Sequence, residues 1–451
     1  MSLLHPDEAS RIGARVLDAS RADETEVTIN SEVDRFARYA DVGPTQSADR
    51  ERVEVSIRVR FRGDDGWREA RASAGATSER EVLAALARAT ELAGKSPANP
   101  DALPLGGPVE VRAHELDEAT LAHGFDAKAR WIGDAVAQAK SAGLEPSGLA
   151  RTTALARSIQ SSSGRDVYGL HQRAAFSLTA TGPSGSGFGE VISKDAALLD
   201  PAAATERAVG KARGAQDPIG VDPGEWTVVL EPNAVSSILL FASYHGFGAR
   251  EVSEESSFLC GRIGEQVFAP GLTIADDAGN DVYPGLPFDG EGTPREAVTL
   301  VDRGRLTGPV TDAVYAKKLG LPCTGHAARQ PSGEGPSAIN LVVGAGDRSV
   351  DELIAGVDRG LLVTQFHYTN MIEPRDLTLT GMTRNGTFLI EGGELKGAVK
   401  NLRFTETLVG AMSRVAAVGA EREVAGALFD GEIVSPGLRI DGFRFTSTTD
   451  F

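Results

Sequence analysis

The chain has 451 residues, 41% of them hydrophobic, which suffices for a folded core and for two or three domains. Its 46 basic and 63 acidic side chains give a net charge of −17, a poor balance for binding a phosphate backbone, so we expect no nucleic-acid partner. No apolar run approaches the ~18 residues that span a bilayer. The first residues, "MSLLHPDEASR", lack the order of a signal peptide. Cys260 and Cys323 form no CxxC pair, so we expect free thiols and a cytoplasmic location.

Helices and antiparallel strands are predicted in the first hundred residues. Residues 6–20 predict a helix with acidic residues in its first turn. Residues 26–30 and 34–40 predict two short strands. Residues 53–74 predict a hairpin, because "VEVSIRVRFR" alternates apolar and polar residues and "GDDG" follows as a turn.

A second helix is predicted after this hairpin, and a linker follows it. Ser78 and Glu81 form a capping-box pattern ahead of the helix, and Gly94 is placed to end it. The stretch "GKSPANPDALPLGGP" has the composition of a linker.

The next hundred residues repeat the mixture of helices and strands. Asp126 is expected to cap a helix that Gly143 ends. Asp200 and Pro201 are expected to start another, since proline suits the first helical position. Between these helices, strands are predicted around residues 150–158, 166–181 and 187–193. "GAQDPIGVDPGE" is the clearest boundary, so the main division of the chain is placed near residue 222.

Strands dominate the prediction beyond this boundary. "EWTVVLE" predicts a strand and "PNAVSSILLFASYH" a helix, and "AVTLVDRGRLTG" and "GTFLIEGGELKG" predict hairpins. The fold class expected is therefore α+β: an N-terminal lobe of helices and antiparallel hairpins, then a β-rich, barrel-like C-terminal domain. The expected division is 1–105 and 106–222 for two regions of the first lobe, and 223–451 for the C-terminal domain.

Local motifs give weak evidence for chemistry. In "HELDEATLAH", His123 follows His114 by nine residues, whereas a zinc helix of the HExxH type needs both histidines on one face. "GPSGSGFGE" and "GAGDRS" lack the order of a phosphate-binding loop, and the first lies between two predicted strands, so we expect a hairpin loop there. His171 has no evident partner.

Several stretches, taken together and in order, resemble the TldD/PmbA family, also called modulators of DNA gyrase. They include "DRFARYADVGPTQS", "SSSGRDVYGLHQRAAFSLTATG", "GEWTVVLEPNAV", "FLCGRIGEQV", "PFDGEGTPREAVTLVDRGRLTG", "YAKKLGLPCTGHA" and "GTFLIEGGELKGAVKNLRFTE". The resemblance implies one of two kinds of subunit. TldD-type subunits carry HExxxH on a helix and a later cysteine, which bind a metal and supply a catalytic glutamate. TldE/PmbA-type subunits usually lack this set and pair with a TldD-type chain.

The family's motif can be placed on this sequence by its "GE" step, which Gly264 and Glu265 resemble. HExxxH then falls on residues 240–245: Leu240 occupies the first ligand position, Phe241 the position of the base, and His245 the second ligand position. The cysteine position falls around Leu428 or Phe429, and no cysteine follows Cys323.

The side chains at these positions cannot perform the family's chemistry. Leucine has no lone pair for a metal, phenylalanine accepts no proton, and a catalytic zinc site typically needs three protein ligands. The simplest interpretation of His245 is a polar residue at a helix end. One alternative stays open: His245, His326 and His367 could converge, with Glu251 or Glu373, into a different metal site.

The resemblance therefore implies a TldE/PmbA-like subunit without a metal of its own, in a heteromeric complex whose TldD-like partner binds zinc. Such a complex would trim or degrade unstructured peptides, including natural-product precursors. This chain would complete the cleft and could offer a strand edge to a peptide. The alternatives are a stand-alone peptidase with a non-standard metal site and a peptide-binding scaffold without catalysis. A direct interaction with DNA is opposed by the net charge of −17.

Overall fold

The computed structural model describes residues 3–111, 115–426 and 432–449. The first lobe is built on one sheet of six long strands in the order β3-β2-β1-β4-β5-β6, all antiparallel. Its strands are β1 (Glu24–Ala40), β2 (Gly43–Gly63), β3 (Gly66–Ala74), β4 (Glu145–Ser161), β5 (Asp166–Thr181) and β6 (Ser186–Ser193). Its helices are α1 (Pro6–Ala19), α2 (Glu79–Lys95), α3 (Glu118–Leu121), α4 (Phe125–Ser141), the 3₁₀ turn η1 (Ala196–Leu198) and α5 (Pro201–Gly214).

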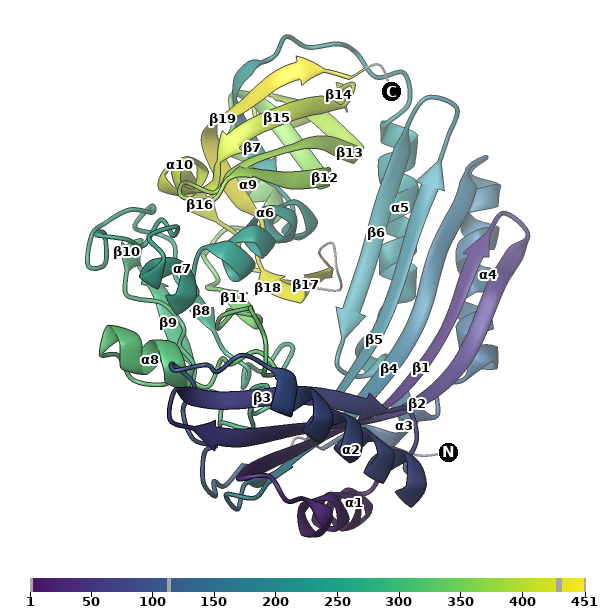
Figure 1. Ribbon diagram of the computed structural model, residues 1–451. Helices are drawn as coiled ribbons and strands as arrows, with labels where there is room; N and C mark the ends of the chain where they lie inside the picture. The colour runs from purple at the N-terminus through teal and green to yellow at the C-terminus, as the bar shows by residue number, and fades with distance from the viewer. Residues whose placement is uncertain (1–2, 112–114, 427–431, 450–451) are drawn as a thin grey trace.

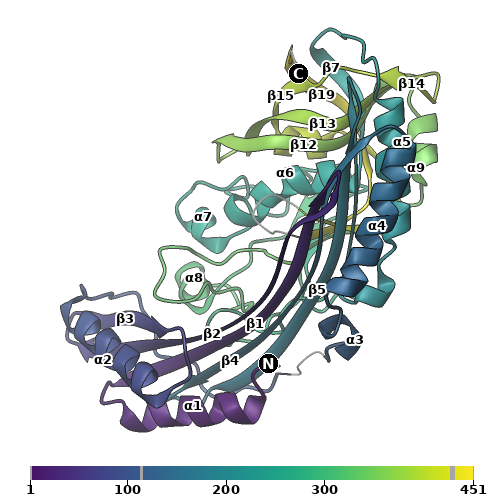
Figure 2. The same cartoon turned by 90° about the vertical axis from the view of Figure 1, so that its right-hand side faces the viewer.

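The sheet is strongly curved, and its helices lie on the convex side (Figures 1 and 2). Side chains alternate between the two faces of a strand, so one set of positions packs against these helices. In β1, Val27 and Ile29 join the core under α1 and α2, while Ala37 and Tyr39 join the core under α4 and α5. The other set faces the C-terminal domain, which lies in the concave side of the curve (Figure 2).

The C-terminal domain contains two further sheets. One is an open sheet of six strands in the order β10-β9-β8-β11-β18-β17. In the other, β12 pairs with both β7 and β13, so the path β12-β7-β19-β15-β13 closes into a ring. The strands are β7 (Gly224–Leu230), β8 (Ile274–Asp276), β9 (Val298–Asp302), β10 (Arg305–Leu306), β11 (Leu341–Val343), β12 (Arg359–Glu373), β13 (Thr378–Glu391), β14 (Glu394–Ala398), β15 (Leu402–Thr407), β16 (Val415–Val418), β17 (Glu423–Gly426), β18 (Glu432–Ser435) and β19 (Leu438–Thr448).

Short helices connect these strands, and one longer helix, α6, lies between the ring and the open sheet (Figure 1). The helices are α6 (Pro232–His245), α7 (Ala249–Ser253), α8 (Ala313–Leu319), α9 (Val350–Ala355) and α10 (Leu408–Ser413). The prediction of an α+β fold with a β-rich C-terminal part is confirmed; its barrel-like character applies to the ring of strands. None of the helices within the described ranges combines the length and apolarity needed to cross a bilayer.

Some boundaries differ from the sequence-based expectations. The two short strands expected at 26–30 and 34–40 are one continuous strand, because β1 is paired along both edges with β2 and β4. The capping box expected at Ser78 is not formed: its hydroxyl donates to the Glu81 carboxylate at 2.5 Å and makes no bond to the helix backbone. Gly94 lies inside α2, and α4 begins one residue before Asp126, with Gly124 at its N-cap.

Other expectations are confirmed. The hairpin at 53–74 corresponds to the end of β2 and to β3, and in "GPSGSGFGE" the first four residues form the turn between β5 and β6 and the rest begins β6. The Asp200 side chain caps α5 by accepting from the Ala203 N–H at 2.9 Å. The strands of the first sheet come from both regions expected within the first lobe, so these regions share one sheet. The domain boundaries at 105 and 222 remain predictions.

Candidate functional site

Helix α6 carries the positions at which the family's metal motif was placed. Pro232 lies in its first turn and Gly246 follows its last residue, which are favourable residues at the two ends of a helix. Nine of its residues are buried, on more than one face. A helix that is apolar nearly all round belongs in a core, and α6 accordingly packs between two sheets.

At these positions of α6, the first ligand position and the position of the base hold hydrocarbon side chains, and only the second ligand position holds a histidine. Leu240 is 4% exposed and belongs to the main C-terminal core, and Phe241 packs against the same core. His245 is the last residue of the helix and is half-buried; burial lowers the pKa of its imidazole, which favours the neutral form. Leu428 and Phe429, at the expected cysteine position, lie outside the described residues. Leu240 and Phe241 offer no donor atom, so the side chains of this helix do not fit a catalytic zinc ion.

The hydroxyl groups of α6 are used for structure. The Ser243 hydroxyl donates to the carbonyl of Ala338 at 2.6 Å, and the Ser236 hydroxyl donates to the carbonyl of Ala425 at 3.2 Å. Ser237 bonds to the carbonyl of Asn233, one turn earlier in the same helix. The bonds of Ser243 and Ser236 attach α6 to the loop and strand beside it.

The structure does not bring the three C-terminal histidines together. His326 is 3% exposed, and both ring nitrogens are engaged: Nε2 with Asp276 Oδ1 at 2.9 Å and Nδ1 with the Thr324 hydroxyl at 2.9 Å. The ring of His367 lies 4.2 Å from that of Tyr368. Among the residues that the structure describes, no group of three or more His, Cys, Asp or Glu is placed to bind a metal.

Within the described ranges, none of the other residues considered as metal ligands or catalytic groups belongs to a metal-binding cluster. Burial raises the pKa of the Glu251 carboxyl. Glu373 accepts from the Arg375 N–H at 3.1 Å. His123 stacks on Trp131 with ring centroids 4.3 Å apart, while His114 lies outside the described residues. His171 packs edge-on against Tyr283 at 5.5 Å, a partner that the sequence did not suggest.

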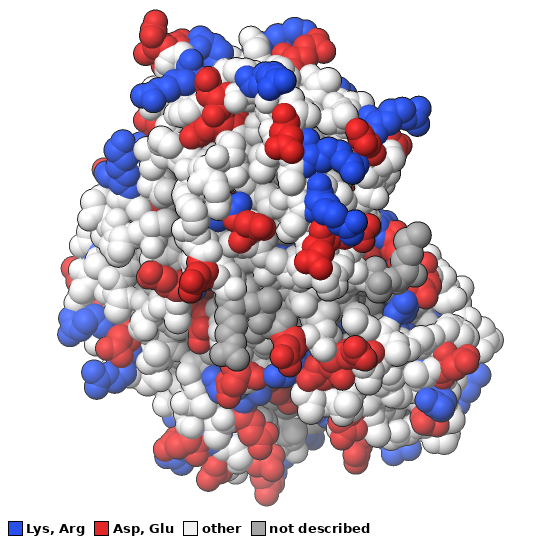
Figure 3. All heavy atoms as spheres, turned by 90° about the horizontal axis from the view of Figure 1, so that it is seen from below, with Lys and Arg blue, Asp and Glu red and all other residues white. Residues whose placement is uncertain are grey.

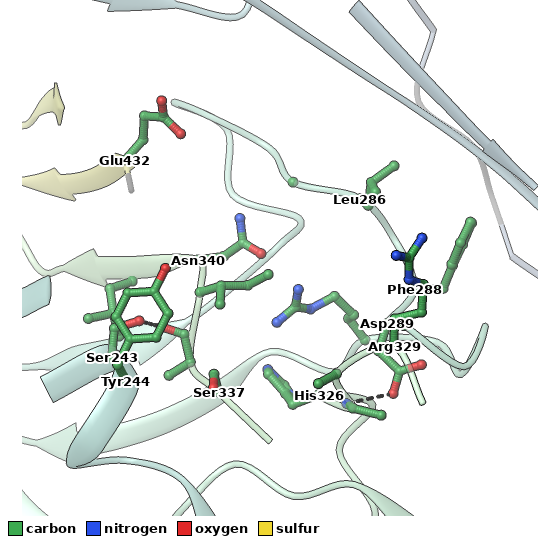
Figure 4. Close-up of a pocket in the computed structure, with 18 of the residues that line it drawn as sticks. Ser243, Tyr244, Leu286, Phe288, Asp289, His326, Arg329, Ser337, Asn340 and Glu432 are labelled. Carbon is green, nitrogen blue, oxygen red and sulfur yellow. Dashed lines mark hydrogen bonds between the residues drawn. The ribbon is translucent and has the colours of Figure 1, made fainter. Parts of the chain in front are cut away.

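A cleft of about 440 Å³ lies between α6, the loops of the C-terminal domain and the concave face of the first sheet. Figure 4 shows Ser243 and Tyr244 of α6 on one side of it and Asp289, His326 and Arg329 on the other. Its apolar lining comes from both lobes: Leu155, Leu240, Leu286, Phe288, Ile339 and Leu341. This volume is in the range of cavities that bind small molecules or a few residues of a peptide.

Three arginines line the same cleft. Arg157 comes from β4, directly opposite Asn30 of β1, and its Nε donates to the Asn30 side-chain oxygen at 2.8 Å. Arg295 and Arg329 come from loops of the C-terminal domain. Burial, together with the positive charges of Arg329 and Arg295, lowers the pKa of Arg157 to about 10. The charges of Arg329 and Arg295 thus disfavour the charged form of Arg157.

Asp289 lines the cleft and Asp276 bonds to its lining residue His326, and both carboxyl groups have partners within the protein. Burial alone would raise the pKa of Asp276, but the hydrogen bond from His326 and the charge of Arg295 keep it below its usual value. Asp289 accepts from the backbone N–H groups of Ala327 and Thr293, both at 2.9 Å, and burial raises its pKa. The arrangement can bind and orient an anionic group, and it contains no combination of nucleophile and base within the described residues that we can assign.

Sequence reasoning identified α6 but not the arginines. Arg157, Arg295 and Arg329 are separated in the chain, and although Arg295 lies in the family-like stretch "PFDGEGTPREAVTLVDRGRLTG", no motif links the three. One signal was available: Leu155 and Arg157 alternate along β4, so they share a face, and both line the cleft.

The chain is similar to proteins of a known family. Residues 223–447 match the family model described as PmbA/TldA metallopeptidase C-terminal domain. A protein named Metalloprotease TldD homolog, from Haemophilus influenzae, is 29% identical over 243 residues, which are 52% of this chain and 49% of that protein. Metalloprotease PmbA from Escherichia coli O157:H7 is 25% identical over 219 residues, 48% of this chain and 45% of that protein.

The match to these curated relatives spans about half of their length. The crystal structure of TldE from Thermococcus kodakarensis superposes with a TM-score of 0.83 at 20% identity, covering 98% of this chain and 100% of that one. At this identity the superposition shows a shared fold. The matched C-terminal half, the named relatives and the common fold together show that the chain belongs to the TldD/PmbA family.

Proposed function

We propose that this chain is a non-catalytic, metal-free subunit of a heteromeric metallopeptidase of the TldD–TldE type, which trims or degrades unstructured peptides. The observation that carries the proposal is that Leu240 lies in the core and Phe241 packs against it, at the positions where a metallopeptidase subunit needs a histidine and a glutamate. The chain keeps the fold of the family but not the donor atoms. In this proposal, zinc and the catalytic base come from a TldD-like partner.

Exposed apolar side chains support a partner surface on the C-terminal domain. Tyr368 and Ile372, near the end of β12, are 67% and 58% exposed. Large apolar side chains that remain exposed on a folded chain often mark an interaction site, and an obligate interface is apolar at its centre. We propose that the β12–β13 hairpin contributes to the contact with the TldD-like subunit.

The contribution of this chain to peptide binding would come from the cleft beside α6. Its volume and mixed apolar and charged lining suit a few residues of an extended peptide. A second cleft of about 480 Å³ lies along the same interface between the lobes, and Arg58 of the sheet reaches Glu291 of the C-terminal domain there at 2.9 Å. β3, an edge strand of the first sheet, is a further place where a peptide strand could pair.

The charge distribution does not favour DNA as the ligand. Seen from below, Lys and Arg side chains are interspersed with Asp and Glu (Figure 3). A DNA-binding face usually gathers its basic residues into a stripe or patch. Together with the net charge of −17, this supports a peptide substrate over direct binding to DNA.

The experiment is co-expression with a TldD-like chain that carries HExxxH, followed by size-exclusion chromatography, metal analysis and a peptide-cleavage assay. We expect a stable heteromer, zinc in the TldD-like subunit only, and cleavage by the heteromer only. Replacing the glutamate of the partner's motif by glutamine should abolish cleavage while the heteromer persists. Cleavage by this chain alone, with stoichiometric zinc bound to it, would favour the stand-alone peptidase instead.

A binding scaffold is distinguished by the same preparation. A scaffold would bind peptides without forming a heteromer, and mixing it with the TldD-like chain would leave the elution volume and the cleavage rate of that chain unchanged. A pair of surface variants tests the proposed contact. Ile372→Asp on β12 should weaken the heteromer. The control is Leu395→Asp, an exposed position on β14, which should leave the heteromer intact if β12 provides the contact.

A further inference from the structure

We propose that the cleft beside α6 is a carboxylate-binding site, in which Arg157, Arg295 and Arg329 hold a carboxylate group of a bound peptide. The inference deepens the proposed function, since it takes from it only that the ligand is a peptide. The carboxylate could be the C-terminus of the peptide or an acidic side chain, and the experiment below separates the two.

The first support is the geometry of the three arginines. They come from three separate segments of the chain and line one cavity, with Arg157 supplied by the first sheet and the other two by the C-terminal domain. A ligand held by all three would therefore contact both lobes. Like charges that converge in a partly buried cavity repel one another, and a bound anion relieves that repulsion.

The second support is that the protein neutralises these charges only in part. Arg295 Nη2 lies 3.5 Å from Asp276 Oδ1, but the Asp276 carboxylate also bonds to His326 and accepts from the Asn340 N–H. Arg329 Nη1 lies 3.5 Å from a carboxylate oxygen of Glu54, with both side chains partly exposed. The hydrogen-bond acceptor of Arg157 is the neutral Asn30 amide.

The other acidic groups around the cleft have partners of their own. Asp289 is saturated by backbone N–H groups, and Glu432 lies 3.0 Å from Arg173. Glu334 also lines the cleft but lies on the loop between His326 and Asn340 and is exposed. The cleft thus has three guanidinium groups and few carboxylates able to pair with them.

The third support is an unused donor on a buried side chain. The Arg295 side chain is 3% exposed, and neither its Nε nor its Nη2 has a hydrogen-bond partner among the described residues. A buried donor without an acceptor is costly, so native structures rarely leave one. A carboxylate is the natural acceptor, because the planar guanidinium group binds its two oxygens side by side.

The rest of the lining suits a peptide that ends or turns in the cleft. Tyr244 and Ile339 are 43% and 52% exposed and line the cavity, while Leu155 and Leu286 line it as well. They can receive an apolar side chain next to the carboxylate. Inorganic phosphate would use the charge of the arginines but not these apolar neighbours.

The test measures peptide binding to the full chain alone by fluorescence anisotropy, so its outcome does not depend on a TldD-like partner. The probe is a short fluorescein-labelled peptide of alanine, leucine and serine with a free C-terminus, compared with its C-terminal amide. Two further amides carry one internal glutamate or the matching glutamine. We expect a carboxylate-bearing peptide to bind about tenfold or more tightly than its uncharged match, as loss of a charged hydrogen bond implies.

The result identifies the source of the carboxylate. Preference for the free acid over the amide assigns the C-terminus, and preference for glutamate over glutamine assigns a side chain. Equal binding of all four peptides would overturn the inference. It would also be overturned if the probe showed no carboxylate preference and millimolar inorganic phosphate displaced it.

Variants connect the binding to these arginines. Arg329→Gln and Arg157→Gln should each remove most of the preference for the carboxylate, and Arg295→Gln should do the same if the variant folds. The matched control is Arg303→Gln, since that side chain is 81% exposed in the β9–β10 turn and should not change binding. A carboxylate preference that survives both Arg329→Gln and Arg157→Gln would refute the site, whether or not the chain forms a heteromer.

Discussion

The concave face of the first sheet buries charged side chains, whereas the nine buried residues of helix α6 in the C-terminal domain are apolar side chains and serines. On the sheet, Arg58 is 4% exposed and lies 2.6 Å from Glu69 and 2.9 Å from Glu291. Arg71 lies 2.5 Å from Glu26, which is 2% exposed. On α6, at the positions where we place the family's catalytic motif, Leu240 lies in the core and Phe241 packs against it.

The comparison shows where the chemistry of the cleft comes from. Buried charges persist only where paired, because removing each from water costs several kcal/mol. Here they are paired between strands of the same sheet, and Arg58 adds a contact to the other lobe through Glu291. The sheet and the loops therefore supply the polar groups of the interface, while α6 acts as an apolar support.

The largest effect should follow from breaking the charge network. Arg58→Met leaves Glu26, Glu69 and Glu291 with one fewer partner, and removing one member of a buried ion pair typically costs ~3–5 kcal/mol. Chemical denaturation measures this loss in the free energy of unfolding. Arg68→Met is the control: this arginine on β3 is 35% exposed and pairs with Asp65, so its loss should cost only ~0–1 kcal/mol. If the two variants lost similar amounts of unfolding free energy, the buried charge network would not stabilise the sheet more than an exposed ion pair does.

On the apolar side, Leu240→His should destabilise the chain by ~1–3 kcal/mol, because it buries an imidazole without a partner. Leu240→Met keeps the volume and should cost less than ~1.5 kcal/mol. Thermal and chemical unfolding measure both variants, and elemental analysis follows zinc. If Leu240→His were as stable as the parent chain and bound zinc stoichiometrically, α6 would be a latent metal site and not an apolar support.

A smaller, pH-dependent change in stability is expected from Glu190, whose carboxyl group lies at the interface of the lobes. Burial raises the pKa of Glu190 to about 7, with Arg173, Arg207 and Glu432 nearby, and its carboxylate accepts from the Gly426 N–H at 3.1 Å. A raised pKa means that the folded chain binds the proton more tightly than the unfolded one. The stabilisation from the protonated form is present below pH ~4.5 and is lost as the pH rises to ~7.

Glu190→Gln should therefore weaken this dependence, since glutamine keeps an acceptor oxygen and does not ionise. Urea denaturation at several pH values between ~4.5 and ~8 compares the variant with the parent chain. The parent should lose more stability than the variant across this range. Parallel curves for the two proteins would show that Glu190 does not titrate in the folded chain.

Much of the fold follows from the sequence, but one face of the first sheet does not. Alternation in β2 predicts that Val55, Ile57 and Val59 are buried, and they are. The same pattern predicts that Arg58 and Arg60 face water, yet both are buried: Arg58 reaches Glu291 of the C-terminal domain, and Arg60 pairs with Glu24 and Glu69 of the first lobe. A strand pattern indicates which side chains share a face but not what will cover it.

The candidate site likewise has one part that the sequence predicts and one part that it does not. The run "SSILLFASYH" predicts a buried helix, and α6 is one. The cleft itself depends on Arg157, Arg295 and Arg329, which meet only because β4 and two loops of the C-terminal domain converge. Their meeting depends on long-range packing, which local periodicity does not encode. His326 also illustrates the limit, since its partner Asp276 lies fifty residues away.

The smallest effect should come from His245, which we place at the second histidine of the HExxxH pattern. Its imidazole is half-buried at the end of α6, and burial lowers its pKa, so it carries little charge near neutral pH. His245→Ala should change the free energy of unfolding by less than ~1 kcal/mol, in the range of substitutions away from buried networks. The heteromer with a TldD-like chain should keep most of its cleavage activity, because the proposed mechanism draws zinc and base from the partner. The paired measurements are chemical denaturation of the single chain and peptide cleavage by the complex. A large loss of cleavage with unchanged stability would mean that His245 takes part in the chemistry, and the assignment of this chain as a metal-free subunit would fail.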